Sequence, residues 1–162
     1  MNADAFRHFY EYHFAENRAI WERFILPLSQ EQFIQRIDYS LGSIRNHVVH
    51  LMSVDDTWFC GLRGVDIPRG LNPVHFHRRD KIRAHWDRVE RDMRAYLAGL
   101  RDDMLFDKPF GEGEDQDLIV WQVLVHVVNH GTDHRAQLLR ALHDLGLRTP
   151  PQDYMFYVYD HP

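Results

Sequence analysis

The sequence predicts an all-α fold, a four-helix bundle. Four long stretches carry apolar residues at steps of three and four, which is the period of a helix with one buried face. All prolines and most glycines lie outside these stretches. The 162 residues suffice for one domain with a sizeable core, and no repeat, low-complexity tract or linker divides them. We therefore expect residues 1–162 to form a single domain.

The first predicted helix covers residues 3–25, where aromatic and apolar side chains recur without interruption. Pro27 ends it, because proline cannot continue a helix. Ser29 and Gln32 match a capping box, in which each residue bonds the backbone N–H of the other. The box predicts a short helical segment over residues 30–36.

The second long helix is predicted over residues 44–62, with Ser43 as its N-cap. Gly61 and Gly64 supply the stop. Residues 65–77 hold two prolines and a glycine without helical period, so they are expected to form a crossover loop. The loop is long for a bundle, where connections usually run about 2–8 residues. The second and third helices should therefore not form a simple antiparallel hairpin.

The third helix is predicted over residues 80–100, with apolar residues on one face and a solvated charged surface on the other. Residues 102–117 are acidic and glycine-containing, and within them residues 105–110 could form a short strand. The fourth helix is predicted over residues 118–145, and the aromatic tail at residues 150–157 should pack back on the bundle. We expect all four tryptophans to anchor the core, because large aromatics dominate core burial.

Composition excludes some classes of function. The net charge of −5 leaves no electrostatic footprint for nucleic acid or for an anionic membrane surface. No apolar run approaches the roughly 20 residues that span a bilayer, and the N-terminus lacks the pattern of a signal peptide. The single cysteine, Cys60, cannot form an internal disulfide, which suits a reducing compartment. We expect a soluble, cytoplasmic protein that acts on a small molecule.

The fourth predicted helix carries His126, His130 and His134, each four residues from the next. Residues four apart stack on nearly the same helical face, so two such histidines can close on one metal ion, as in one half of zinc-protease motifs. The protease glutamate is missing, because Gly131 follows His130. The helical wheel points His130 and His134 toward a half-buried pocket and His126 outside it. The competing interpretation is that all three are surface or satisfied core histidines.

A metal site needs a further ligand from another helix, and the second helix offers His47 and His50. The wheel favours His47, because it lies closer to the centre of the apolar face. The residue pattern alone therefore leaves both open, with a preference for His47.

Three segments carry a further pattern: Tyr12-His13-Phe14-Ala15-Glu16-Asn17, Ser43-Ile44-Arg45-Asn46-His47-Val48-Val49-His50-Leu51 followed by Trp58-Phe59, and Asn129-His130-Gly131-Thr132-Asp133-His134-Arg135-Ala136-Gln137. These segments resemble the DinB/YfiT-like family of metalloenzymes, over nearly the whole chain. In that family the second helix opens with a Ser-Ile-Arg-like start and places a ligand histidine seven residues on, which implies His50 here. The resemblance thus implies His50, His130 and His134 as ligands, with His47 and His126 as neighbours. Ala136 departs from the glycine of many members.

Three neutral imidazoles suit a divalent transition metal, with Zn²⁺ or Ni²⁺ favoured and iron or manganese as alternatives. Three protein ligands leave coordination positions open, as in catalytic sites. The resemblance implies a thiol-dependent S-transferase that acts on small electrophiles with a low-molecular-weight thiol as cosubstrate, and it also implies a homodimer.

Two other functions remain open at this stage. One is a metal-dependent hydrolase, for which Asp55 or Asp133 could supply a general base. The other is a non-catalytic metal-binding stress protein, in which the ion only joins two helices. No catalytic residue is assigned, and Arg135 could either orient an anionic substrate or form an intramolecular ion pair.

Overall fold

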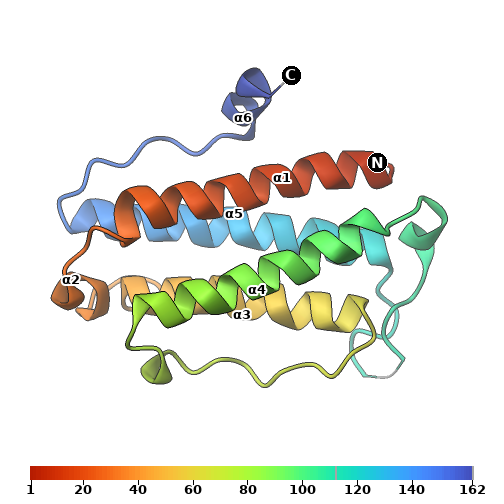
Figure 1. Cartoon of the computed structure of the whole chain (residues 1–162), viewed down its shortest axis with the longest axis horizontal. Helices are drawn as coiled ribbons and strands as arrows, with labels where there is room; N and C mark the ends of the chain where they lie inside the picture. The colour runs from red at the N-terminus through yellow and green to blue at the C-terminus, as the bar shows by residue number, and fades with distance from the viewer. Residues whose placement is uncertain (112, 162) are drawn as a thin grey trace.

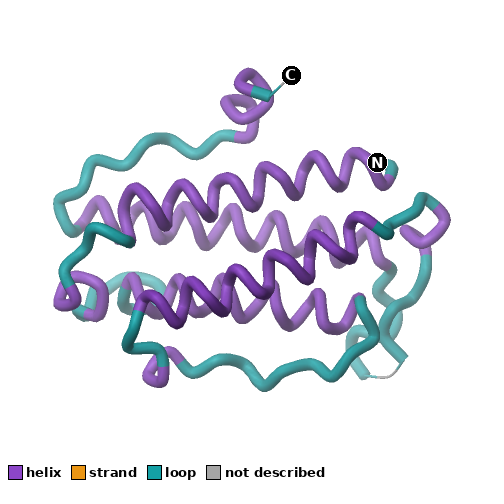
Figure 2. The backbone as a smooth tube through the Cα atoms, in the orientation of Figure 1, coloured by secondary structure: helices purple, strands orange, loops and turns teal. Residues whose placement is uncertain are grey.

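The computed structural model describes residues 1–111 and 113–161. Glu112, in the predicted acidic loop, and Pro162 lie outside the described residues. Within these two ranges the chain consists of helices and loops, without strands (Figure 2). The prediction of an all-α fold is confirmed.

Four long helices lie side by side and make up most of the molecule (Figure 1). Helix α5 packs against α3 and α1, and α4 packs against α3 and α1. Their apolar faces meet in one continuous core. The four are α1 (Ala3–Ile20), α3 (Ile44–Leu62), α4 (Arg79–Ala98) and α5 (Val120–Asp144), and the shorter elements are η1 (Trp21–Ile25), α2 (Gln30–Ile34), η2 (Pro73–His75), η3 (Asp103–Phe106) and α6 (Tyr154–Asp160).

The predicted first helix is divided in two. Its first part is α1, and its last turn, η1, is a π-helix in which the Leu26 N–H reaches the Trp21 carbonyl at 2.8 Å. The capping box that follows is present: Ser29 Oγ accepts from the Gln32 N–H at 3.1 Å, and the Gln32 side chain accepts from the Ser29 N–H at 3.0 Å. Helix α2 is slightly shorter than predicted.

Helix α3 begins as predicted, because Ser43 Oγ accepts from the Asn46 N–H at 3.1 Å. Gly61, however, is a buried residue inside the helix and not part of its stop. A β-carbon there would collide with the Phe110 ring, so the missing side chain admits an aromatic residue from the loop before α5. Of the two glycines predicted to end the helix, only Gly64 has the positive φ, +65°, that suits a glycine after a helix end.

The connections differ in part from prediction. Residues 63–78 run along the outside of α3 (Figure 1), and the Leu71 N–H donates to Ser53 Oγ at 3.1 Å. The predicted strand over residues 105–110 is wrong. Residues 103–106 form the 3₁₀ helix η3, since their backbone groups bond locally, as Leu105 N–H does to Asp102 O at 3.3 Å.

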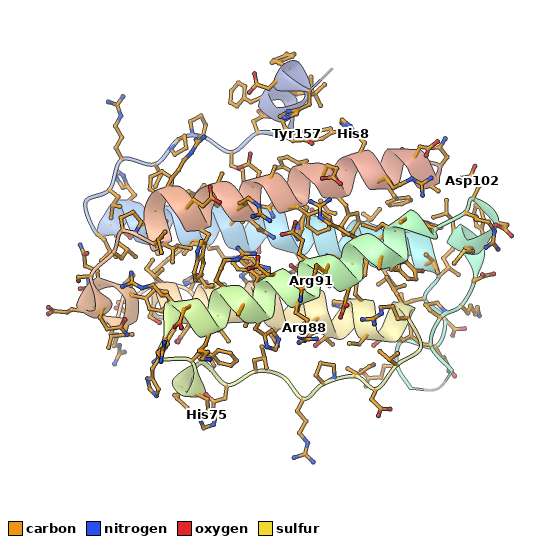
Figure 3. All side chains as sticks on the ribbon, viewed as in Figure 1. His8, His75, Arg88, Arg91, Asp102 and Tyr157 are labelled. Carbon is orange, nitrogen blue, oxygen red and sulfur yellow. The ribbon has the colours of Figure 1, made fainter. Side chains whose placement is uncertain are left out.

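The tail packs back on the long helices, as predicted, and contains α6. The Tyr154 ring meets the rings of Phe9 and Tyr12 edge-on, with ring centroids 5.3 and 5.1 Å apart. The Tyr157 ring lies against His8 with a centroid distance of 5.7 Å (Figure 3).

The prediction of four core tryptophans holds only in part. Trp21 and Trp86 are buried against each other, Trp58 is half-buried, and Trp121 is 37% exposed near the start of α5. None of the helices within the described ranges combines the length and apolarity that crossing a bilayer requires.

Candidate metal centre

Three histidine side chains from two adjacent helices meet at one point. His50 comes from α3, and His130 and His134 come from consecutive turns of α5. The Nε2 atom of His50 lies 3.1 Å from that of His130 and 3.3 Å from that of His134. One ligand nitrogen from each ring lies within 4.8 Å of the other two. The structure thus brings together the three residues that the family resemblance implied.

His47, which the wheel favoured, stands apart from this group. It is fully buried, and its Nδ1 lies 2.8 Å from the Ser43 carbonyl oxygen one turn earlier in α3. That backbone oxygen can only accept, so Nδ1 carries the proton. The helical wheel compares the angle of each histidine with the centre of a single apolar face, but α3 packs against both α4 and α5. Contact with two neighbours turns His50, at the edge of that face, inward.

The environment of His50 and His130 disfavours their protonated forms. Burial, then the neighbouring His134 and His50 rings, lower the pKa of His130 to about 4. Burial, followed by His134 and His47, also lowers the pKa of His50. Neutral imidazole offers one lone pair, which is the form that binds metals.

The arrangement of nitrogens fits a divalent transition metal. Imidazole nitrogens at such separations can share one metal ion when each presents its lone pair. Zn–N bonds of about 2.0–2.1 Å in tetrahedral geometry place two ligand nitrogens about 3.3–3.4 Å apart. The His50–His130 and His50–His134 separations, 3.1 and 3.3 Å, are close to that value. The cluster could therefore bind a metal ion.

His126 lies outside the cluster, as the wheel predicted. It is exposed, and its ring packs edge-on against Trp58 at 5.0 Å, with the His130 ring at 5.8 Å.

A small pocket of 280 Å³ opens beside His50, between α3 and the connection that follows it. This volume lies near the lower end of ligand pockets, about 300–1,000 Å³. A small molecule could therefore approach the cluster from this side. The pocket is lined by Leu41, Asn46, His50, Ser53, Gly70, Leu71 and Pro73.

Arg135 has no carboxylate within ion-pair distance among the described residues, but it lies in a buried polar network. It is fully buried, and its Nη1 lies 3.1 Å from His13 Nδ1 and 3.1 Å from Asn17 Oδ1. Since arginine only donates, His13 Nδ1 must accept, and His13 Nε2 must carry the ring proton. That nitrogen lies 3.2 Å from Asp55 Oδ2, so His13 donates to the carboxylate. No local sequence pattern predicts this buried set of hydrogen bonds, because its residues come from three helices.

Gly131 explains how His13 reaches α5. An added β-carbon at this position would lie 2.5 Å from His13 Cε1 and 2.7 Å from His13 Nδ1. Such contacts are too close for real atoms, so the residue after His130 must be glycine for this packing. The glycine that replaces the protease glutamate therefore places a histidine of α1 beside the cluster.

The two carboxylates considered as a hydrolytic base each bond another side chain. Asp55 is buried and pairs with His13, whereas Asp133 is exposed and accepts from Gln137 Nε2 at 2.9 Å.

Cys60 is expected to react slowly with alkylating agents. Burial, and then the Asp56 carboxylate that its thiol faces at 3.6 Å, raise its pKa above the ordinary value, so little thiolate forms at pH 8. Iodoacetamide labelling followed by mass spectrometry should give a lower rate than for N-acetylcysteine, and Asp56→Asn should raise that rate. A wild-type rate equal to that of N-acetylcysteine would contradict the expectation.

The sequence of this chain is similar to those of known proteins. The sequence model of the DinB family matches residues 1–161. The chain is also similar to Protein DinB of Bacillus subtilis (strain 168), with 26% identity over 158 residues that cover 93% of this chain and 91% of that protein.

Proposed function

Since the chain belongs to the DinB family, we propose that it is a metal-dependent enzyme whose His50, His130 and His134 hold one divalent transition metal. The main support for this proposal is that three Nε2 atoms, one from α3 and two from α5, lie close together. Imidazole-only coordination favours Zn²⁺ or Ni²⁺. In this proposal α1, α3, α4 and α5 form the four-helix bundle of a single DinB/YfiT-like domain, with a crossover between the second and third long helices.

We assign the enzyme to S-transfer from a low-molecular-weight thiol to a small electrophile. When bound, the metal favours the ionised form of a nearby thiol, which is the nucleophile. The sulfur then forms a bond to the electrophilic carbon, the leaving group departs with its electron pair, and the thiol proton passes to solvent. In this proposal the small electrophile lies in the 280 Å³ pocket beside His50.

The chain's own residues favour thiol transfer over hydrolysis. Hydrolysis gains from a positioned general base, and Asp55 and Asp133 both bond other side chains. An ionised thiol needs no such base at the moment of attack. Asn46 and Ser53, which line the pocket, present polar groups that could orient a substrate.

The assay combines monochlorobimane with a panel of low-molecular-weight thiols and the Zn²⁺- or Ni²⁺-loaded protein. Conjugation above the uncatalysed rate should require both metal and thiol, and a chelator should abolish it. Turnover of an ester without thiol would favour the hydrolase instead. Silence in both assays with metal bound would favour a non-catalytic metal-binding protein. We also propose a homodimer, which light scattering after size-exclusion chromatography would test.

A further inference from the structure

Within the described part of the chain, the structure shows no group that holds the imidazole ring of His130 in its orientation through Nδ1. A histidine that binds a metal through Nε2 carries its proton on Nδ1, and this group usually donates to a carboxylate, carbonyl or water that fixes the ring. His130 Nδ1 is buried and has no hydrogen-bond partner among the described residues. A buried polar group without a partner is costly, so its position calls for an acceptor.

Asp55 supplies an acceptor atom in the same part of the core. Its Oδ2 accepts from His13, whereas its Oδ1 is buried and also lacks a partner within the described ranges. Asp55 is only 1% exposed, so solvent does not satisfy this oxygen. Several buried polar atoms lack a partner in the described ranges, and beside the histidine cluster these include the His130 and His134 Nδ1 groups as possible donors and Asp55 Oδ1 as an acceptor.

Packing places Asp55 near the backbone turn that carries His130. The His13 ring lies against Gly131, directly after His130 in α5, and the same ring bonds Asp55. Asp55 therefore lies next to the α5 turn that carries His130. Electrostatics agree: burial and neighbouring imidazoles lower the pKa of His130, but Asp55 acts in the opposite sense and raises it.

We infer that Asp55 is the positioning carboxylate of the metal centre, and that one water molecule carries the hydrogen bond from His130 Nδ1–H to Asp55 Oδ1. Asp55 is held by His13, whose other ring nitrogen accepts from Arg135, so a chain of hydrogen bonds would run from α1 through α3 to the histidine on α5. The inference rests on the proposed metal centre. It assigns Asp55 to ring orientation and to the electron-donating strength of the ligand, not to contact with substrate.

The first test measures Zn²⁺ affinity by competition with a chromogenic chelator. Groups that hydrogen-bond a metal ligand typically raise metal affinity about 10–100-fold. Asp55→Asn should therefore weaken Zn²⁺ binding about tenfold, and Asp55→Ala about a hundredfold. The absorption bands of bound Co²⁺ should shift in both variants, which a purely structural role would not cause.

Asp56→Asn is the matched control. Asp56 is the adjacent buried carboxylate on α3, but it faces His85 and Arg88. Its variant should lose some stability and keep the wild-type affinity and Co²⁺ bands. Equal affinity of wild type and Asp55→Ala would overturn the inference, as would equal losses in Asp55→Asn and Asp56→Asn.

A measurement on the wild type covers the case in which the Asp55 variants do not fold. In the Zn²⁺-loaded protein labelled with ¹⁵N-histidine, the Nδ1–H proton of His130 should be visible and exchange slowly with solvent. Exchange as fast as that of an exposed histidine such as His126 would overturn the inference. If the wild type binds no metal at all, the proposed function fails, and this outcome is distinct from failure of the Asp55 assignment alone.

Discussion

Replacing His130 with alanine is expected to abolish metal binding at micromolar protein concentration while the chain remains helical. Two of the three Nε2 atoms would remain, on different helices. Even outer-shell groups contribute about 10–100-fold to metal affinity, so loss of a direct ligand should cost about a thousandfold or more. Elemental analysis of the purified variant and chelator competition would measure the loss, and far-UV circular dichroism would verify the fold.

His126→Ala is the control on the same helix. His126 lies one turn before His130 and is exposed, and its ring contacts Trp58 rather than the nitrogens of the cluster. Its affinity should equal that of the wild type. If His130→Ala retains metal as well as His126→Ala does, the three histidines are not the binding site.

The site was predictable where its signal is local. The spacing of His130 and His134 puts them on one face of any α-helix, so sequence alone pairs them. The choice between His47 and His50 is not local, because it depends on which two helices α3 touches. The wheel therefore preferred the wrong residue, and only the family resemblance pointed to His50.

The fold follows the same division. The cap at Ser43 and the box at Ser29 involve residues three apart, and both were predicted. The strand expected at residues 105–110 failed, because a strand needs a partner and a sequence pattern does not show whether one exists. The burial of Arg135 could not be predicted, since two of its hydrogen-bond partners, His13 and Asn17, lie more than 100 positions away in α1.

Arg135→Met is expected to cause a large loss of stability. Methionine keeps the helix propensity and much of the apolar stem, so the loss isolates the guanidinium. Without it, His13 Nδ1 and Asn17 Oδ1 lose their donor, and the buried Asp55 loses the charge that balances it. Removing one member of a buried ionic network costs about 3–5 kcal/mol, a large share of a typical 5–15 kcal/mol. Urea denaturation of the metal-free proteins would measure the change.

Arg140→Met gives the comparison on the same helix. Arg140 is 62% exposed and pairs with Asp144 at 2.9 Å, so its loss should cost less than about 1 kcal/mol. The double variant Arg135→Met/Asp55→Asn then tests the chain through His13. Removing both charges leaves no uncompensated ion, so the double variant should be more stable than the sum of the single losses predicts, by about 0.5–3 kcal/mol. Additive losses would mean that Arg135 and Asp55 act independently, and a loss below 1 kcal/mol for Arg135→Met alone would mean that the buried guanidinium is not needed to balance Asp55.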